Sequence, residues 1–376
     1  MEKSILVFSI LKVTWMFGVY ISFSILVLIA SILPKIPSSY WVFRSTDFGK
    51  IQVFYIAIVL FLVGFLLPQK NITFWILQSL LLGSIFYHGF ILFKYTHFYP
   101  VKKSKPQYTS SKKLSFISAN VYQFNTDYEQ FIQLIKKYQP DVFLTMESNG
   151  DWEKALEKLE VEYPYQHKVG LENTYGIHLY SKLEITESQT HYFVADDIPS
   201  IEVVIKSQEG HKFVFFGVHP PPPSPTEEKT SKERDGDLLS VAKRVKELHL
   251  PTIVVGDFNN VAWSKSSILF RKTSELIDPR IGHGFVSTFH AKYKFLRFPI
   301  DLMFHSTDVF VTQLKTLENF GSDHLPVYCE FFIDAELEHQ EDQVETATQE
   351  EENEAEEMIQ DGIEEQSDRE RVVTED

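Results

Sequence analysis

Three long apolar stretches dominate the first quarter of the chain. Residues 13–33, 51–69 and 71–93 contain no charged side chain when His88 is counted as neutral. A helix rises about 1.5 Å per residue, so each stretch is long enough to cross a hydrocarbon core about 30 Å thick. The pattern therefore predicts three transmembrane helices, which together form a membrane anchor of residues 1–97. The first stretch is not read as a signal peptide, because it has no small-residue cleavage site.

The basic residues that flank these stretches predict an orientation. Lys35, Arg44 and Lys50 lie in the first loop, and further lysines follow the third stretch, whereas Lys3 and Lys70 are the main cations on the other side. The positive-inside rule then places the N-terminus outside and the large domain in the cytoplasm of a protein integral to the inner or cell membrane. The lysines after the third stretch also suit a solvated tether. The single cysteine, Cys329, excludes an intramolecular disulfide and is compatible with a cytoplasmic domain.

A different rhythm begins after residues 98–113, which are rich in Pro, Ser and Lys and are predicted to be a linker. Two segments have apolar residues at helical spacing, YEQFIQLIKKY and SKERDGDLLSVAKRVKELHL. The short apolar runs between and around them are typical of strands: LSFISANVY, VFLTM, IHLYS, HYFVA, IEVVIKS, KFVFFGVH, TIVVGDF and LPVYCEFFI. Residues 114–333 are therefore predicted to be one α+β domain, a sandwich of two or four layers.

The C-terminal residues 334–376 carry most of the acidity. They contain 19 acidic residues and two arginines, a net charge of −17 in a chain whose total is −15. Such a segment has too little apolar surface to offset its ordering entropy, so we predict an acidic tail that is disordered or at most a frayed, solvated helix. Its role is either to solubilise the protein or to bind a protein partner.

Polar residues interrupt or directly follow the predicted strands. A strand that ends in a carboxylate, amide or imidazole aims that group at one rim of its sheet. Each case also has a purely structural explanation, such as a helix cap at ESNG or an Asx-turn in GDFN. Those explanations would have to hold independently at almost every site. The candidate residues are Asn120, Glu147, His219, Asp257, Asn259, Asp301, Asp323 and His324.

These residue types suit metal-assisted hydrolysis. Carboxylate and amide oxygens without a cysteine cluster or paired histidines favour Mg²⁺ or Mn²⁺ over a structural zinc ion. An imidazole oriented by a carboxylate is the arrangement that a general base requires. Hydrolysis of a phosphate ester needs both parts, because a cation neutralises the developing charge while a base generates the nucleophile.

The ordered series N…E…H…GDFN…ID…SDH resembles the endonuclease/exonuclease/phosphatase superfamily. The resemblance covers residues 114–333 and rests most on GDFN and SDH at this separation. The stretches HPPPPSP, GDFNNVAWS and GSDHLP are similar to a bacterial, membrane-anchored and uncharacterised subgroup. The resemblance implies a four-layered α/β/β/α sandwich like that of pancreatic deoxyribonuclease. It also implies a hydrolase of phosphate ester bonds that depends on Mg²⁺ or Mn²⁺.

The resemblance further implies a role for each candidate residue. Glu147 would be the main metal ligand, with Asn120 and Asp323 completing the metal site. Five residues would be catalytic. Asp257 would orient or activate the water and Asn259 would donate to a phosphoryl oxygen, while His324, held by Asp301, would be base or transition-state stabiliser. His219 would lie across the phosphate as an acid or a second donor.

The substrate stays open at this point between a lipid head group and nucleic acid. Residues 114–333 carry a net charge of −8, whereas proteins that hold duplex backbones normally present a basic face. A local patch of Lys292, Lys294 and Arg297, interleaved with Tyr293 and Phe295, suits a loop beside the site and equally a solvated loop. The expectation is a membrane-anchored phosphodiesterase or phosphatase. The alternatives are a membrane-tethered nuclease and a non-catalytic membrane scaffold that binds partners through the acidic tail.

Overall fold

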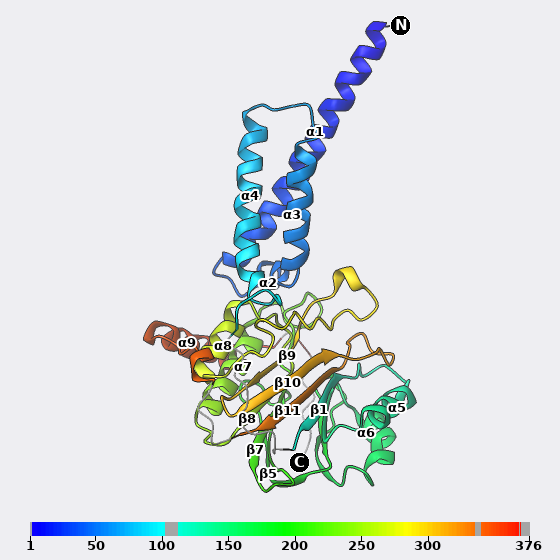
Figure 1. The fold of residues 1–376 in the computed structure, drawn as a ribbon, viewed down its shortest axis with the longest axis vertical. Coiled ribbons are helices and arrows are strands. Elements are labelled where there is room, and N and C mark those ends of the chain that lie inside the picture. The colour runs from blue at the N-terminus through cyan, green and yellow to red at the C-terminus, as the bar shows by residue number, and fades with distance from the viewer. Residues whose placement is uncertain (1, 102–111, 335–339, 368, 370–376) are drawn as a thin grey trace.

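The computed structural model describes residues 2–101, 112–334, 340–367 and 369. Most of the linker predicted over residues 98–113 lies outside these ranges. Figure 1 shows a group of helices that rises from one end of a larger domain built on two sheets.

The N-terminal group contains the helices α1 (Glu2–Ile32), α2 (Trp41–Phe48), α3 (Lys50–Gly64) and α4 (Ile72–Phe93), with the short η1 (Leu33–Lys35). In the described part of the chain, two helices are long and apolar enough to cross a membrane, within Leu11–Lys35 and Ile72–Phe93. A third crossing exists only if α2 and α3, bent by 70° at their junction, count as one span. The 15 residues of α3 extend only about 22 Å. The three predicted transmembrane helices thus become two or three.

The larger domain is a sandwich of two sheets. Within the described residues, one sheet has the strand order β10-β11-β1-β2-β4-β3 and the other the order β5-β6-β7-β8-β9. The pairs β1/β2 and β7/β8 are parallel, and the remaining pairs are antiparallel. The strands are β1 (Leu114–Asn120), β2 (Val142–Met146), β3 (Tyr165–Val169), β4 (Ile177–Ser181), β5 (Glu184–His191), β6 (Ser200–Lys206), β7 (Lys212–Val218), β8 (Thr252–Asp257), β9 (Asp301–His305), β10 (Val309–Thr316) and β11 (Val327–Ile333).

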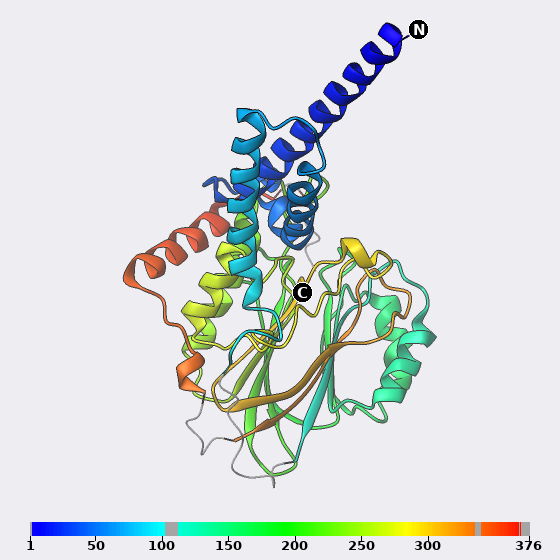
Figure 2. The ribbon, with the colours of Figure 1, turned by 45° about the horizontal axis from the view of Figure 1, so that its top comes forward.

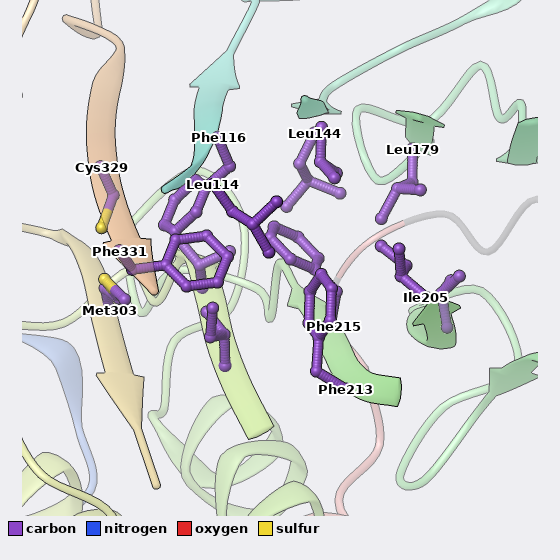
Figure 3. Close-up of a cluster of buried hydrophobic side chains, with 14 of the residues drawn as sticks. Leu114, Phe116, Leu144, Leu179, Ile205, Phe213, Phe215, Met303, Cys329 and Phe331 are labelled. Atoms are coloured by element: carbon purple, nitrogen blue, oxygen red, sulfur yellow. The ribbon is translucent and has the colours of Figure 1, made fainter. Parts of the chain in front are cut away.

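The core between the sheets is formed by the inward-facing residues of both. Figure 3 shows this cluster, in which Phe116 of β1 meets Phe215 of β7 edge to face with ring centroids 5.3 Å apart. The strands that contribute to it read as nearly continuous apolar runs because helices cover their outer faces as well.

Two helical layers complete the sandwich. One apolar cluster joins the outer face of the first sheet to α5 (Tyr128–Tyr138), α6 (Gly150–Leu156) and η2 (Glu157–Leu159). Another joins the second sheet to α7 (Lys232–Lys246) and α8 (Lys265–Ser274). The predicted four-layered α/β/β/α sandwich is therefore confirmed.

The acidic tail differs from the prediction. Residues 349–364, expected to be disordered or a frayed solvated helix, form α9 (Gln349–Glu364) after the short η4 (Glu341–Gln343), and α9 lies on α7 and α8 in Figure 1. A capping box between Thr348 and Glu351 starts the helix. Ala355 and Ile359, four residues apart, are buried against Leu239 of α7. The prediction rested on the overall acidic composition of the tail and did not take account of this narrow apolar stripe. The stripe supplies the buried apolar surface that a fully polar tail would lack.

The sandwich contacts the N-terminal helices at one rim. The Trp263 indole N–H, six residues after β8, donates to the Asp47 carbonyl at 2.8 Å. The Trp41 amide donates to the Lys229 carbonyl at 2.9 Å. An apolar cluster that includes Trp263, Tyr95 and Leu92 joins the two parts. The rim at which β8 ends therefore faces the N-terminal helices.

Candidate active site

The candidate residues meet at this same rim for topological reasons. Asn120 ends β1, Glu147 follows β2, His219 follows β7 and Asp257 ends β8, and these are the two parallel pairs. The strands β9 and β11 run antiparallel to their neighbours, so their beginnings lie at the rim where β8 and β1 end. That geometry brings the remaining residues there as well: Asp301 at the start of β9, and Asp323 and His324 before β11. Asp257 and Asp301 are direct partners in the ladder.

Asn120 joins the two sheets across the site. Its Nδ2 donates to Oε1 of Glu147 at 2.8 Å and to Oδ2 of Asp257 at 3.1 Å. Its Oδ1 accepts from the Tyr122 amide at 3.0 Å. Asn120 is buried, so its amide is held between the two carboxylates. In this arrangement Asn120 positions Glu147 and Asp257, and its own oxygen is occupied by the backbone.

Glu147 has an unusual backbone conformation and an unusual pKa. Its φ of 60° lies in the left-handed region, and this turns the side chain at the end of β2. Oε2 accepts from the Gln123 amide at 3.1 Å. Burial raises the pKa of Glu147 to about 7, although the hydrogen bonds from Asn120 and Gln123 favour the charged form. A bound cation would offset that cost of burying a carboxylate.

His324 lies between two carboxylates. Nδ1 is 2.8 Å from Oδ2 of Asp301, and Nε2 is 3.6 Å from Oδ2 of Asp257. Burial alone would lower the pKa of His324, but the charges of Asp301 and Asp257 outweigh it and raise the pKa to about 10. Burial in turn raises the pKa of Asp257. Ligand atoms of Asp257, Asp301 and His324 lie within 4.8 Å of one another, which also makes this trio a possible metal group.

His219 faces Asp257 from the other side. Its Nε2 is 3.9 Å from Oδ2 of Asp257. Burial lowers the pKa of His219 to about 4, against the opposing charge of Asp257. The rings of Tyr175 and His219 lie with their centroids 5.5 Å apart, and the Tyr175 hydroxyl donates a hydrogen bond to Glu227 at 2.6 Å. Sequence reasoning missed Tyr175 and Glu227, because neither ends a recognisable strand.

Asn259 and Asp323 complete the rim. The Asn259 amide N–H donates to Oδ1 of Asp257 at 2.9 Å, and its side chain donates to the Pro220 carbonyl at 3.0 Å. The φ of Asn259, 47°, is left-handed, a conformation that Asn tolerates better than most residues. Asp323 is half-buried, and its carbonyl accepts from the Ala291 amide at 2.6 Å. All eight predicted residues thus lie at one rim.

The donor set of the rim suits a hard divalent cation. Glu147 and Asp323 supply carboxylate oxygens, and Asn120 lies beside Glu147. Oδ1 of buried Asp301 has no hydrogen-bond partner among the described residues. Mg²⁺ and Mn²⁺ prefer such oxygen ligands. The hydrogen bond between His324 and Asp301 is typical of an imidazole and its orienting carboxylate, which favours Glu147 over the Asp257, Asp301 and His324 trio as the metal side.

Solved structures with TM-scores of 0.50 and 0.51 show the same fold, and a third is similar at a score of 0.49. A TDP2 from D. rerio, complexed with a single-strand DNA product, is 20% identical, with 58% of this chain and 99% of that chain covered at a TM-score of 0.50. An endonuclease/exonuclease/phosphatase family protein from Bacteroides thetaiotaomicron is 20% identical, with coverage of 61% and 98% at 0.51. A mannosyl-6-phosphatase from the same organism is 20% identical, with coverage of 58% and 100% at 0.49. No curated protein matches the chain.

A family model gives the more specific result. The model described as "Endonuclease/Exonuclease/phosphatase family" matches residues 117–324, more than half of the chain. The similarity to the membrane-anchored bacterial subgroup stays a prediction. The matched residues begin inside β1 and end at His324, so they enclose all eight residues of the rim. The chain therefore belongs to the endonuclease/exonuclease/phosphatase family.

Proposed function

We propose that this protein is a membrane-anchored, divalent-metal-dependent phosphoesterase, a phosphodiesterase or phosphatase that uses an activated water molecule. Members of its family are hydrolases of phosphate esters. The observation that carries the proposal is the single constellation at the rim, in which Asn120 joins Glu147 to Asp257 and His324 approaches Asp257 from the other side. The Glu147 side of this constellation offers ligands for a cation, and the His324 side offers groups that can transfer or donate a proton.

Glu147 and Asp323 would hold Mg²⁺ or Mn²⁺, with Asn120 beside them. When bound, the cation neutralises charge that develops on the phosphoryl oxygens. Asn120 also keeps the Glu147 and Asp257 carboxylates at a fixed separation, because it donates to both. That rigidity preorganises the site before the substrate arrives.

Asp257 would orient and deprotonate the attacking water. Its pKa is raised by burial, which makes it a stronger base than an exposed carboxylate. His324, whose pKa is raised to about 10, carries a proton on each nitrogen at neutral pH, so it would donate to a phosphoryl oxygen. Of the two roles expected for His324, the proposal therefore takes transition-state stabilisation, with Asp301 orienting the ring.

His219 and Asn259 would bind the phosphoryl group from the other side. Because its pKa is lowered to about 4, His219 is neutral at pH 7 and has no readily transferable proton. Of the two roles expected for His219, the proposal therefore takes that of a second hydrogen-bond donor, through Nε2 in the tautomer that carries the proton there. Asn259 has one side-chain N–H committed to Pro220 and a second available for a phosphoryl oxygen.

The N-terminal helices would anchor the protein in the inner or cell membrane. The N-terminus would lie outside, and the sandwich would lie on the cytoplasmic side. The apolar helices α1 and α4 support the anchor, as does the position of the site on the rim that contacts them, while the orientation rests on the flanking basic residues. A lipid head group is thereby favoured as the substrate. A nuclease is the second candidate, because the D. rerio TDP2 was captured with a DNA product, but the net charge of −8 over residues 114–333 opposes it.

A non-catalytic scaffold is the third candidate. It would use the acidic tail to bind a protein partner. The apolar stripe of α9 is already buried against α7 and α8 of the same chain, and Glu351, Glu352, Glu354 and Glu356 pair with lysines of those two helices. A partner would therefore have to bind the remaining acidic residues or displace these ion pairs. All eight residues meet at the rim, which a scaffold does not require.

The test is hydrolysis by the full-length protein in nanodiscs, with Mg²⁺, with Mn²⁺ and with a chelator. The substrates are a chromogenic phosphodiester, a phosphomonoester, plasmid DNA and phospholipids. We expect turnover of at least one ester that requires a divalent cation. If a folded protein binds no cation and hydrolyses none of the panel, the scaffold replaces the enzyme.

A further inference from the structure

One loop of the sandwich exposes large apolar side chains without an acidic residue nearby in sequence. Residues 290–297 read HAKYKFLR, and residues 292–296 are all exposed. Phe295 is 91% exposed, Tyr293 58% and Leu296 56%. A solvated loop rarely exposes three large apolar residues together, so this surface is expected to bind a partner molecule or a membrane.

The loop lies next to the N-terminal helices. Nε2 of Gln52, in the first turn of α3, donates to the Phe295 carbonyl at 2.9 Å. Tyr55 and Val59, which follow Gln52 on the same stripe of α3, are 62% and 56% exposed. Figures 1 and 2 both show the short turn η3 (Lys294–Leu296), in yellow, standing beside the base of the N-terminal helices. The loop therefore continues the outward-facing apolar stripe of α3 at its end nearest the sandwich.

The composition of the loop matches the head-group layer of a bilayer. Aromatic residues are favoured at the boundary between hydrocarbon and water, and basic residues are attracted to anionic head groups. Lys292 and Lys294 are exposed on either side of Tyr293. The Arg297 guanidinium instead donates to the carbonyl of Ala291, which closes the base of the loop.

The base of the loop is also part of the candidate site. The Ala291 amide donates to the carbonyl of Asp323 at 2.6 Å. The ring of Phe289 contacts the ring of His324 at 4.9 Å between centroids. A surface that binds this loop would therefore also lie next to the entrance of the candidate site.

We propose that residues 290–297 dip into the head-group layer of an anionic membrane and that the substrate is a phosphate ester carried by a lipid in that layer. This proposal rests on the phosphoesterase function and the membrane anchor proposed above. The hydrogen bond between Gln52 of α3 and Phe295 sets the depth of the loop. The contacts of Ala291 with Asp323 and of the preceding Phe289 with His324 keep the loop next to the site. A nucleic acid that stacks on the same aromatic residues is the competing occupant.

The first experiment locates the loop in the full-length protein. A Phe295→Cys variant is labelled with an environment-sensitive fluorophore, and native Cys329 does not compete because it is buried. The protein is placed in nanodiscs that contain a lipid with a nitroxide on its head group. The control is Val161→Cys, since Val161 is 92% exposed and lies near Tyr163, which bonds to Pro140 at the opposite rim.

We expect the nitroxide to quench the label at residue 295 at least about twofold more strongly than the label at residue 161. Equal quenching at the two positions would overturn membrane contact. This measurement needs no catalytic turnover, so it separates failure of the loop proposal from failure of the proposed function.

The second experiment tests the substrate. Hydrolysis of phospholipid in the nanodisc, of a soluble phosphodiester and of plasmid DNA is measured for Phe295→Glu and for Val161→Glu. We expect the ratio of lipid to soluble hydrolysis to fall about tenfold in Phe295→Glu and to stay unchanged in Val161→Glu. An unchanged ratio in both variants, or a loss confined to plasmid cleavage, would overturn the lipid substrate even if the label is quenched.

Discussion

Nδ1 of His324 lies 2.8 Å from Oδ2 of Asp301, and the other ring nitrogen faces Asp257 at 3.6 Å. The imidazole therefore bridges two buried carboxylates that are direct partners in the ladder between β8 and β9. This relationship makes one prediction about how the site works as a unit.

His324→Ala and Asp301→Ala are expected to lose activity together. Asp301 acts through His324, so removing it after the imidazole has gone should cost little more. We expect each single variant to lose on the order of 100-fold in kcat/KM and the double variant to resemble His324→Ala. Steady-state kinetics on a soluble phosphodiester measures this. Losses that multiply in the double variant would contradict the pairing.

Glu147→Gln should abolish metal-dependent hydrolysis while preserving the fold. The amide keeps the size of the side chain but removes the charge that would bind the cation. We expect turnover to fall at least about 100-fold and the affinity for Mn²⁺, measured by calorimetry, to fall with it. Glu187→Gln on β5 is the matched control, because that side chain is exposed and distant in the fold. Normal Mn²⁺ affinity in Glu147→Gln would move the metal site to the Asp257, Asp301 and His324 trio.

His178 should make the protein acid-sensitive. It is fully buried in β4, and burial, with a smaller effect of Lys168, lowers its pKa to about 3. The pKa of His178 in the folded protein lies below its unfolded value of 6.5. The contribution of neutral His178 to the free energy of unfolding is therefore fully present above pH 6.5 and is lost as the pH falls toward 3. At pH 5 the cost of His178 is about 2 kcal/mol.

The measurement is denaturant unfolding of the full-length protein in detergent at pH 7.5 and pH 5, followed by tryptophan fluorescence. His178→Gln should lose less stability on acidification than the wild type, by that amount. His211→Gln, at an exposed position, should behave like the wild type. The prediction fails if both variants lose the same stability between the two pH values.

Arg369 should hold the end of the tail on the sandwich. Its guanidinium makes a bidentate contact with buried Asp197, at 2.8 and 3.0 Å, and lies over the ring of Tyr175 at 5.4 Å. Removing it would leave the Asp197 carboxylate without this partner, which we expect to destabilise the protein by about 3 kcal/mol.

Hydrogen exchange gives the more specific readout for Arg369. In Arg369→Ala, amides of α9 should exchange faster than in the wild type, while those of β1 and β2 should change little. Lys136→Ala removes an exposed cation and serves as the control. Unchanged exchange in α9 would show that its apolar contacts with Leu239 and Leu269 suffice.

Most of the elements and the location of the site were predictable because their signals are local. The run HYFVA, predicted to be a strand, instead lies mostly beyond β5, and β3 and β10 were not predicted. Each uncharged stretch, and each apolar run ending in a polar residue, is an unbroken run of consecutive positions. The rim follows from one rule, since the ends of parallel strands meet at one edge of a sheet and antiparallel neighbours begin there. Asn120, Glu147 and Asp257 could therefore be assigned to one site, although the contacts between them could not be derived.

The sequence by itself determined the apolar helices, the two-sheet sandwich and the residues at its rim. Only the tertiary structure decided that Asn120 bridges Glu147 and Asp257, that Tyr175 supports His219, and that α9 lies on α7. It alone also placed Phe295 beside Gln52, 243 residues earlier in the chain. The physical reason is that periodicity and composition record the environment of a residue relative to its neighbours in sequence. A contact between distant segments depends on how whole layers pack, which no short stretch of sequence encodes.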